Sequence, residues 1–391
     1  MDRRTFVKGA SSALALGLGG CTVHQTGSAT GLTDVPPGYR PDPKTDEAGF
    51  WMHADFAEEK TRTAANRIRD KAINDLVADS MCRLTRNYCG DVRTYVLRVP
   101  VFNAFASPNG VVSVWSGLLL RMEDESQLAA VLGHEFAHYR RRHTLAQARD
   151  IRNKTDLAAF LGMGLAAMGA GPGAQDLTQL LTMASINAFS REHEREADAL
   201  GLQVMADAGY DPFACAQVWK NLNAERDASG EKREYDVFVA THPDPGERIE
   251  NLTKLAEARS KAGNAPNRLR EAIAPIRPML LADEVNLGRF KQTLQLFDRL
   301  LKDDARPGEI LFAKGELHRK RNKEADDVIA LGFYHEACEA KGAPADAFRQ
   351  VGIMRWRRGE KGPAREYFRR YLNAAPDASD RQMIQSYLAG A

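Results

Sequence analysis

The chain has 391 residues, of which 43% are hydrophobic and 27% charged, enough to bury a full core and typical of two domains. Residues 1–20 hold three of the 54 basic and one of the 52 acidic residues, so the remainder carries no net charge. Without a basic excess, we expect no nucleic-acid partner and no electrostatic attraction to an anionic membrane surface.

The first 20 residues are typical of an export signal. Residues 2–8, DRRTFVK, have the twin-arginine (Tat) pattern, and the weakly apolar run that follows is shorter than the roughly 20 residues of a membrane span. The run ends in LGGC, which resembles a bacterial lipobox with Cys21 as the lipidated residue; an ordinary signal peptide with an incidental cysteine is the alternative. Either way we expect a periplasmic protein, with a lipid anchor in the outer membrane favoured.

Residues 21–48 are rich in Gly, Pro, Thr and Asp, which predicts a flexible tether. A helix is expected from about Arg62 to Thr85, because apolar residues recur there at helical spacing. Cys82 and Cys89 lie at the end of that helix and in the loop beyond it. In an oxidising compartment this predicts a disulfide that closes a small loop.

Two strands are predicted next, at residues 92–99 and 111–115, from the alternation in VRTYVLRV and the run VVSVW. The segment VFNAFASPNG lies between them. An edge strand there would pair with an extended substrate backbone and give affinity with little sequence preference. The alternative is an ordinary hairpin around the Pro-Asn-Gly turn.

Residues 128–143, LAAVLGHEFAHYRRRH, place His134 and His138 four apart in an apolar run with helical periodicity. Four residues of helix turn the chain by about 400°, so both imidazoles leave one face and can bind one metal ion. Glu135 lies about a quarter turn away, which suits a general base beside the ion. A zinc ion with an open coordination position lowers the pKa of its bound water to about 7, so a neighbouring carboxylate can take a proton from that water. The alternative is a buried helix without a metal, which a third ligand would exclude.

The segment SREHEREADALG, residues 190–201, supplies that third ligand. Among its three glutamates only Glu194 is followed four residues later by an aspartate, Asp198. On a helix the two lie one turn apart, so Glu194 can bind the metal while Asp198 fixes the tautomer of a ligand histidine. We therefore predict one zinc ion per chain, and we expect His143 and His193 to be surface residues.

LGHEFAH followed by SREHEREAD resembles the M48 family of zinc metallopeptidases, within the gluzincin group, over roughly residues 60–255. NAFASPNG upstream and THPDPGER downstream are similar to the family's accompanying signatures. The resemblance implies the following roles: His134, His138 and Glu194 as ligands, Glu135 as base, Asp198 behind the ligands, and Asn103 and Ala104 at the edge that binds substrate.

In that family a His-Pro histidine and a following arginine face the active site. The resemblance therefore implies that His242 caps the zinc in a resting state or stabilises the oxyanion, and that Arg248 grips the substrate backbone. The alternative for His242 is a loop histidine satisfied by a backbone carbonyl.

From about residue 264 the sequence is helical throughout, and it shows a tetratricopeptide-like pattern near the 34-residue period. The repeat positions are occupied by Gly352, Gly359, Ala364, Phe368 and Pro376, with a poorer copy at Gly315, Ala330 and Tyr334. Stacked helix pairs would bind extended or helical partners on a concave face. A helical bundle that only braces the first domain is the alternative.

These observations predict an α+β, mostly helical fold, with a gluzincin-type domain and small sheet over residues 49–263 and an all-α repeat domain over 264–391. The architecture is most similar to the β-barrel assembly-enhancing proteases, which implies an endopeptidase for misfolded or stalled envelope proteins, in contact with outer-membrane assembly machinery. A chaperone-like adaptor with a latent zinc site, or a zinc ion that only stabilises the fold, are the alternatives.

Overall fold

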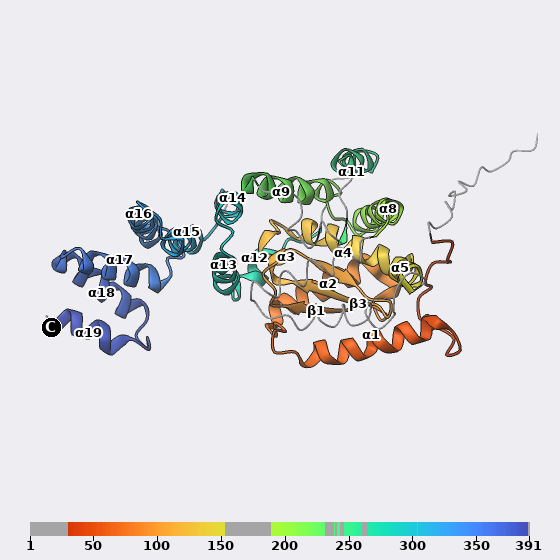
Figure 1. Ribbon diagram of the computed structural model, residues 1–391, viewed down its shortest axis with the longest axis horizontal. Helices are drawn as coiled ribbons and strands as arrows, with labels where there is room; N and C mark the ends of the chain where they lie inside the picture. Colours follow the sequence, from red (N-terminus) through yellow and green to blue (C-terminus); the bar gives the residue numbers. More distant parts are fainter. Residues whose placement is uncertain are drawn as a thin grey trace, which may run out of the picture.

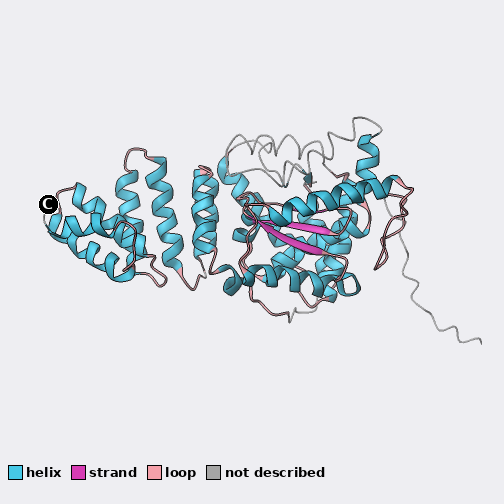
Figure 2. Ribbon diagram, turned by 90° about the horizontal axis from the view of Figure 1, so that it is seen from below, coloured by secondary structure: helices cyan, strands magenta, loops and turns pink. Residues whose placement is uncertain are grey.

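Two parts of the chain lie side by side along the longest axis of the computed structural model (Figure 1). It describes residues 30–152, 189–230, 238, 241–242, 246–259, 265–302 and 304–389. The first part contains the sheet with helices packed around it, and the second is a row of helices that leads to the C-terminus (Figure 2). A small sheet among many helices confirms the predicted α+β, mostly helical fold class.

The three-stranded sheet has the order β1-β3-β2 and is built from β1 (Arg93–Leu97), β2 (Ala104–Ala106) and β3 (Val111–Trp115). β3 is central and buried at every position; it pairs in parallel with β1 and antiparallel with β2. A tight turn joins β2 to β3, in which the Gly110 N–H donates to the Ser107 carbonyl at 3.0 Å. The segment before β3 therefore forms both an edge strand of the described sheet and a hairpin turn, which were the two alternatives.

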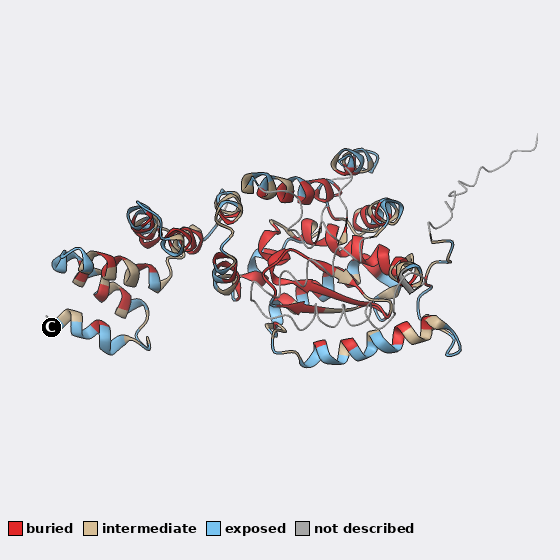
Figure 3. Cartoon of the chain, in the orientation of Figure 1, coloured by how far each residue is buried: buried red, intermediate tan, exposed pale blue. Residues whose placement is uncertain are grey.

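Helix α4 (Glu125–Arg140) is the buried centre of the first part, between α2 (Lys71–Thr85) and α8 (Arg191–Asp207). It begins at the N-cap Asp124, whose carboxylate accepts the backbone N–H of Gln127. It is buried on nearly every side, as expected for a helix that is apolar all round (Figure 3). Polar groups on α4 therefore lie in the interior, where each needs a partner or an ion.

The remaining helices of the described residues are α1 (Asp46–Thr63), η1 (Arg86–Tyr88, a 3-10 turn), α3 (Ser116–Arg121), α5 (His143–Arg152), α9 (Ala214–Ser229), α11 (Arg248–Glu257), α12 (Leu269–Ile273), α13 (Arg277–Asn286), α14 (Phe290–Leu301), α15 (Pro307–Arg321), α16 (Asp326–Glu339), α17 (Ala345–Arg357), α18 (Lys361–Ala374) and α19 (Arg381–Ala389).

The expected helix from about 62 to 85 is wrong over its first part, because α1 ends at 63 and α2 begins at 71. Between them Arg67 forms a β-bridge with Leu97, and the Ile68 N–H donates to the Val96 carbonyl at 2.9 Å. The backbone of these residues pairs with β1 and is therefore not helical. The expected tether also packs on the fold where it is described: Val35 is buried, and its N–H bonds to a carbonyl of α4.

The second part is made of helix pairs, α15 with α16 and α17 with α18. A Cβ added at Gly315 would lie 2.5 Å from the Tyr334 ring, and one added at Gly352 would lie 2.6 Å from the Phe368 ring. Small and aromatic residues at the repeat positions therefore pack face to face. The tetratricopeptide assignment itself stays a prediction.

The hydrophobic core does not break at the predicted domain boundary between 263 and 264. One cluster of buried side chains continues from the sheet through Leu269 and Leu281 to Leu317 of α15. A separate cluster, which includes Leu331 and Val351, begins at Leu311 on the same helix. Helices α12 to α14 thus pack as part of the first body, and the second body becomes independent within α15.

The cysteines behave in two ways. Cys82, at the end of α2, forms a disulfide with Cys89, while Cys215 and Cys338 are buried free thiols. Cys21 and the expected signal peptide lie outside the described residues. Among the helices of the described residues, none combines the length and apolar character needed to cross a membrane.

Candidate metal centre

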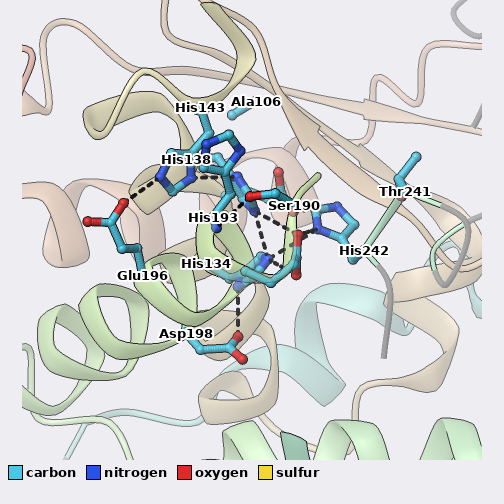
Figure 4. A network of polar contacts seen from close by, with 12 residues as sticks. Ala106, His134, His138, His143, Ser190, His193, Glu196, Asp198, Thr241 and His242 are labelled. Atoms are coloured by element: carbon cyan, nitrogen blue, oxygen red, sulfur yellow. Dashed lines mark hydrogen bonds and ion pairs between the residues drawn. The ribbon is translucent and has the colours of Figure 1, made fainter. Parts of the chain in front are cut away.

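His134 and His138 lie one turn apart on α4 and point at the same spot (Figure 4). Their Nε2 atoms are 3.0 Å apart, and both rings are buried. Helix geometry alone brings these rings together, since residues four apart share a face. The local sequence therefore determines the first half of the site.

Glu194 reaches the same spot from the first turn of α8, which begins at the N-cap Ser190. Its carboxylate oxygens lie 3.5 Å from Nε2 of His134 and of His138. His242 completes the group: its Nδ1 is 3.0 Å from Glu194 Oε1 and 3.2 Å from His134 Nε2. One donor atom from each of these four buried residues lies within 4.8 Å of the others.

Two glycines let the helices that carry the ligands approach this closely. A Cβ added at Gly201 of α8 would lie 2.8 Å from the backbone nitrogen of His134, and one at Gly133 would lie 2.9 Å from the Gly201 carbonyl oxygen. No larger residue fits at this crossing without moving a backbone. The distance from Glu194 to the histidines thus depends on backbone contact between α4 and α8.

The donor group fits a zinc ion. Bonds of about 2.0–2.1 Å in a tetrahedral arrangement hold the ligand atoms roughly 3.3 Å apart. Five separations between donor atoms run from 3.0 to 3.5 Å, and all four donor atoms lie within 4.8 Å of one another. Three imidazole nitrogens and a carboxylate oxygen are also ligands that zinc accepts. Such a group, buried and convergent, is a candidate metal site.

Glu135 stands beside the donor group without joining it. Its side chain is 1% exposed, and Oε1 lies 3.6 Å from His242 Nε2 with no hydrogen-bond partner. Burial raises the pKa of this carboxyl, against the opposing effect of His242 and His134. A backbone hydrogen bond from Ala106 also ties the carboxylate to β2. An unpaired buried carboxylate oxygen here is suited to accept a proton from water.

Charged side chains lie behind the ligands His134 and Glu194. Asp198 Oδ1 lies 3.0 Å from His134 Nδ1, so it can hold that ring with Nε2 directed at the metal position. Burial would lower the pKa of His134, but hydrogen bonds to Asp198 and Glu194 outweigh it and raise the pKa to about 9. Burial would raise the pKa of Glu194, but His242 and Arg248 hold it well below its usual range. The carboxylate therefore stays ionised, as a ligand must.

Arg248 is buried beside the donor group. Its Nη1 is 2.8 Å from Glu194 Oε2, its Nη2 is 2.6 Å from Asp198 Oδ1, and its guanidinium lies 4.1 Å from the Trp219 ring centre. The side chain is 2% exposed. Because both outer nitrogens are bonded to carboxylates inside the protein, Arg248 holds the ligand shell in this structure. Its expected role in gripping the substrate backbone stays a prediction.

The expectation that His143 lies at the surface is wrong, because its side chain is fully buried. Its Nδ1 is 3.0 Å from Nδ1 of His138, and its Nε2 is 3.0 Å from Glu196 Oε2 (Figure 4). Burial lowers its pKa to about 3, so the ring is neutral. His193 is partly buried, and its ring stacks on His143 with centres 4.4 Å apart. The short spacing between His138 and His143 was the one feature of the sequence that could have indicated this contact.

The expected substrate edge is covered in this structure: Asn103 is 4% exposed and Ala104 is 0% exposed. Their substrate role stays a prediction, and it requires this edge to open. The Cys82–Cys89 disulfide lies at the end of α2, apart from the donor group.

Comparisons with known proteins agree with the donor geometry. Residues 67–256 match peptidase family M48. The chain is 36% identical over 168 residues to the mitochondrial metalloendopeptidase OMA1 of Schizosaccharomyces pombe, covering 43% of this chain and 48% of that protein. It is 32% identical over 200 residues to a putative beta-barrel assembly-enhancing protease of Vibrio cholerae, covering 48% and 40%. It is 27% identical over 275 residues to the beta-barrel assembly-enhancing protease of Escherichia coli, covering 64% and 52%. The chain thus spans about half the length of these relatives.

Proposed function

Residues 67–256 form a peptidase family M48 domain, and on this premise we propose that the protein is a zinc-dependent endopeptidase of the bacterial cell envelope. Its substrates are misfolded or stalled envelope and outer-membrane proteins. The observation that carries the peptidase activity is the buried group of His134, His138 and Glu194, with the unpaired Oε1 atom of Glu135 beside it. The relatives support the same class, since each is named as a metalloendopeptidase or a protease.

The residues divide the chemistry between them. Zinc held here supplies a Lewis acid for the peptide carbonyl and acidifies water. Glu135 takes the proton from the attacking water and passes it to the nitrogen of the leaving amine. Asp198 keeps His134 in the tautomer that leaves Nε2 free for the metal, and Arg248 keeps Glu194 ionised.

The site is arranged as a latent one. His242 is 1% exposed, and its Nδ1 stands where a fourth ligand would stand, within 3.0–3.2 Å of Glu194 and His134. Four protein ligands close a zinc site, whereas catalysis needs an open position. This geometry favours His242 as a resting-state cap over a role at the oxyanion. Activity then requires His242 to leave and the β2 edge to become accessible.

The envelope location and partners rest on other features. The sequence begins with a Tat-type signal and a lipobox-like LGGC, and the Cys82–Cys89 disulfide suits an oxidising compartment. The C-terminal helix pairs offer a surface for assembly machinery. Labelling with a radioactive fatty acid tests the anchor: the wild type should be labelled and Cys21→Ser should not, and an unlabelled wild type would leave only an ordinary signal peptide.

The decisive test compares Glu135→Gln with Glu192→Gln, an exposed glutamate two residues from a ligand. Both proteins should contain one zinc ion per chain. Glu135→Gln should cleave unfolded casein about 10²- to 10⁴-fold more slowly, because the base is lost, and Glu192→Gln should match the wild type. An unaffected Glu135→Gln protein would contradict the peptidase mechanism.

The second candidate is a chaperone-like adaptor, which the closed position of His242 favours. Complementation of a deletion strain separates the two. If Glu135→Gln restores envelope assembly as well as the wild type, binding rather than hydrolysis is the function. If it fails while its zinc content is normal, hydrolysis is required.

A further inference from the structure

Behind His138 the structure holds a second hydrogen-bonded chain, made of His143 and Glu196. His138 Nδ1 lies 3.0 Å from His143 Nδ1, and His143 Nε2 lies 3.0 Å from Glu196 Oε2. The rings of His138 and His143 are almost completely buried, whereas the Glu196 side chain is 18% exposed. The chain therefore runs from the ligand to a carboxylate near the surface, with no step longer than a hydrogen bond.

The position of the metal determines every proton along this chain. His138 directs Nε2 at the donor group, 3.0 Å from His134 Nε2, so its proton must sit on Nδ1. That N–H donates to Nδ1 of His143, which must then be unprotonated. The His143 proton is left on Nε2, where it donates to the Glu196 carboxylate. Only this order satisfies both contacts, so a negative carboxylate acts on His138 through a neutral ring.

The two ligand histidines are thus backed in different ways. His134 meets its carboxylate directly, with Asp198 Oδ1 3.0 Å from Nδ1. His138 meets its carboxylate through His143. The Phe189 ring stacks on the His138 ring, with centres 3.9 Å apart and an angle of 24° between the ring planes. The hydrogen bond to His143 and the stacked Phe189 ring both act on the orientation of the His138 ring.

The backbone is arranged to bring His143 back over His138. Helix α4 ends at Arg140 and α5 begins at His143. Between them Arg142 has a φ of +59°, a left-handed conformation that is unfavourable for a residue with a side chain. Glu196 leaves α8 about 200° around the helix from Glu194. The sharp turn after α4 and the second face of α8 meet at this contact.

We propose that His143 and Glu196 are positioning residues for the metal: they fix the tautomer and ring orientation of His138 and raise its strength as a ligand. The inference rests on the proposed zinc site, but not on proteolysis. Neither residue belongs to the group of four donor residues. Their loss should weaken zinc binding while the four donor residues remain.

The test measures zinc affinity by competition with a chelator at fixed pH, in a Glu135→Gln background where proteolysis is strongly reduced. His143→Phe keeps the ring packing but removes the acceptor, and it should bind zinc about 10- to 100-fold more weakly. Glu196→Gln keeps an acceptor and removes only the charge, and it should lose up to about tenfold. His193→Phe is the matched control, because that ring stacks on His143 yet makes no hydrogen bond to His143 or His138.

The double variant shows whether His143 and Glu196 act on zinc affinity through one hydrogen-bonded chain or independently. The double variant His143→Phe with Glu196→Gln should bind zinc no more weakly than His143→Phe alone, because the charge acts only through the ring. The imidazole proton on Nδ1 of His138 should give a slowly exchanging ¹⁵N-attached signal in the zinc-loaded protein, and His143→Phe should lose it. Thermal unfolding of the metal-free proteins reports folding separately.

The outcomes are separable. If the Glu135→Gln protein, with His143 and Glu196 intact, binds no stoichiometric zinc, the proposed function itself fails. If it binds zinc and both single variants match it, or if their losses simply add, the positioning chain is overturned while the zinc site stands. Weaker zinc binding in both, with a non-additive double variant and an unchanged control, supports the chain.

Discussion

The crossing of α4 and α8 at Gly201 is a sharp point to perturb, since it sets the distance between the ligands on the two helices. Gly201→Ala places a Cβ 2.8 Å from the backbone nitrogen of His134, whereas ordinary contact begins at 3.4 Å. The helices must therefore separate by about 0.6 Å along that line. Zinc–ligand distances vary only by about 0.2 Å in well-formed sites, so Glu194 and the two histidines cannot all keep good bonds.

Two effects on stability oppose each other in this variant. Alanine in place of a helical glycine contributes about 1 kcal/mol in an unhindered helix. Overpacking of a closed interior costs about 1–3 kcal/mol. We expect a net loss of up to about 2 kcal/mol in the free energy of unfolding. The displaced carboxylate should also weaken zinc binding at least about tenfold, which corresponds to about 1.4 kcal/mol.

The assay combines urea unfolding of the metal-free protein with zinc competition against a chelator. Gly332→Ala is the matched control, because it lies within α16 with nothing within 4 Å of an added Cβ. It should gain up to about 1 kcal/mol and leave zinc affinity unchanged. The reasoning is refuted if Gly201→Ala keeps both the wild-type stability and the wild-type zinc affinity.

Four further predictions concern the site and the packing of other parts of the fold. Hydrogen bonds to Arg268 outweigh burial and lower the pKa of Glu125 from 4.5. The ionised carboxylate therefore stabilises the folded protein above pH 4.5, and this contribution is lost as the pH falls through the lowered pKa. The unfolding free energies of the wild type and of Glu125→Gln should converge in acid. Arg121 is buried between two glutamates, so Arg121→Met should cost about 3–5 kcal/mol in chemical unfolding, and a neutral result would contradict this. His242→Ala should raise casein cleavage if His242 is the resting cap, whereas a lower kcat at equal zinc content would assign it to the oxyanion. Gly352→Ala should lower the melting temperature of the C-terminal helices, because its Cβ would meet the Phe368 ring at 2.6 Å, while zinc affinity stays the same.

The sequence by itself determined those features of the site that depend on residues close together in the chain. His134, Glu135 and His138 are placed by the turn of one helix, and Glu194 and Asp198 by one turn of another, so their spacing predicts the metal site. The predicted resemblance to peptidase family M48 is confirmed by the match over residues 67–256.

The tertiary structure alone decided what depends on contacts between distant segments. Arg248 binds two carboxylates inside the protein, because α11 packs against α8 and α9. Glu196 lacks the aspartate one turn on that singles out Glu194, yet the turn at Arg142 brings His143 to it. Helix periodicity describes one element at a time, whereas these side chains are placed by the crossing of several, and no local pattern encodes that crossing.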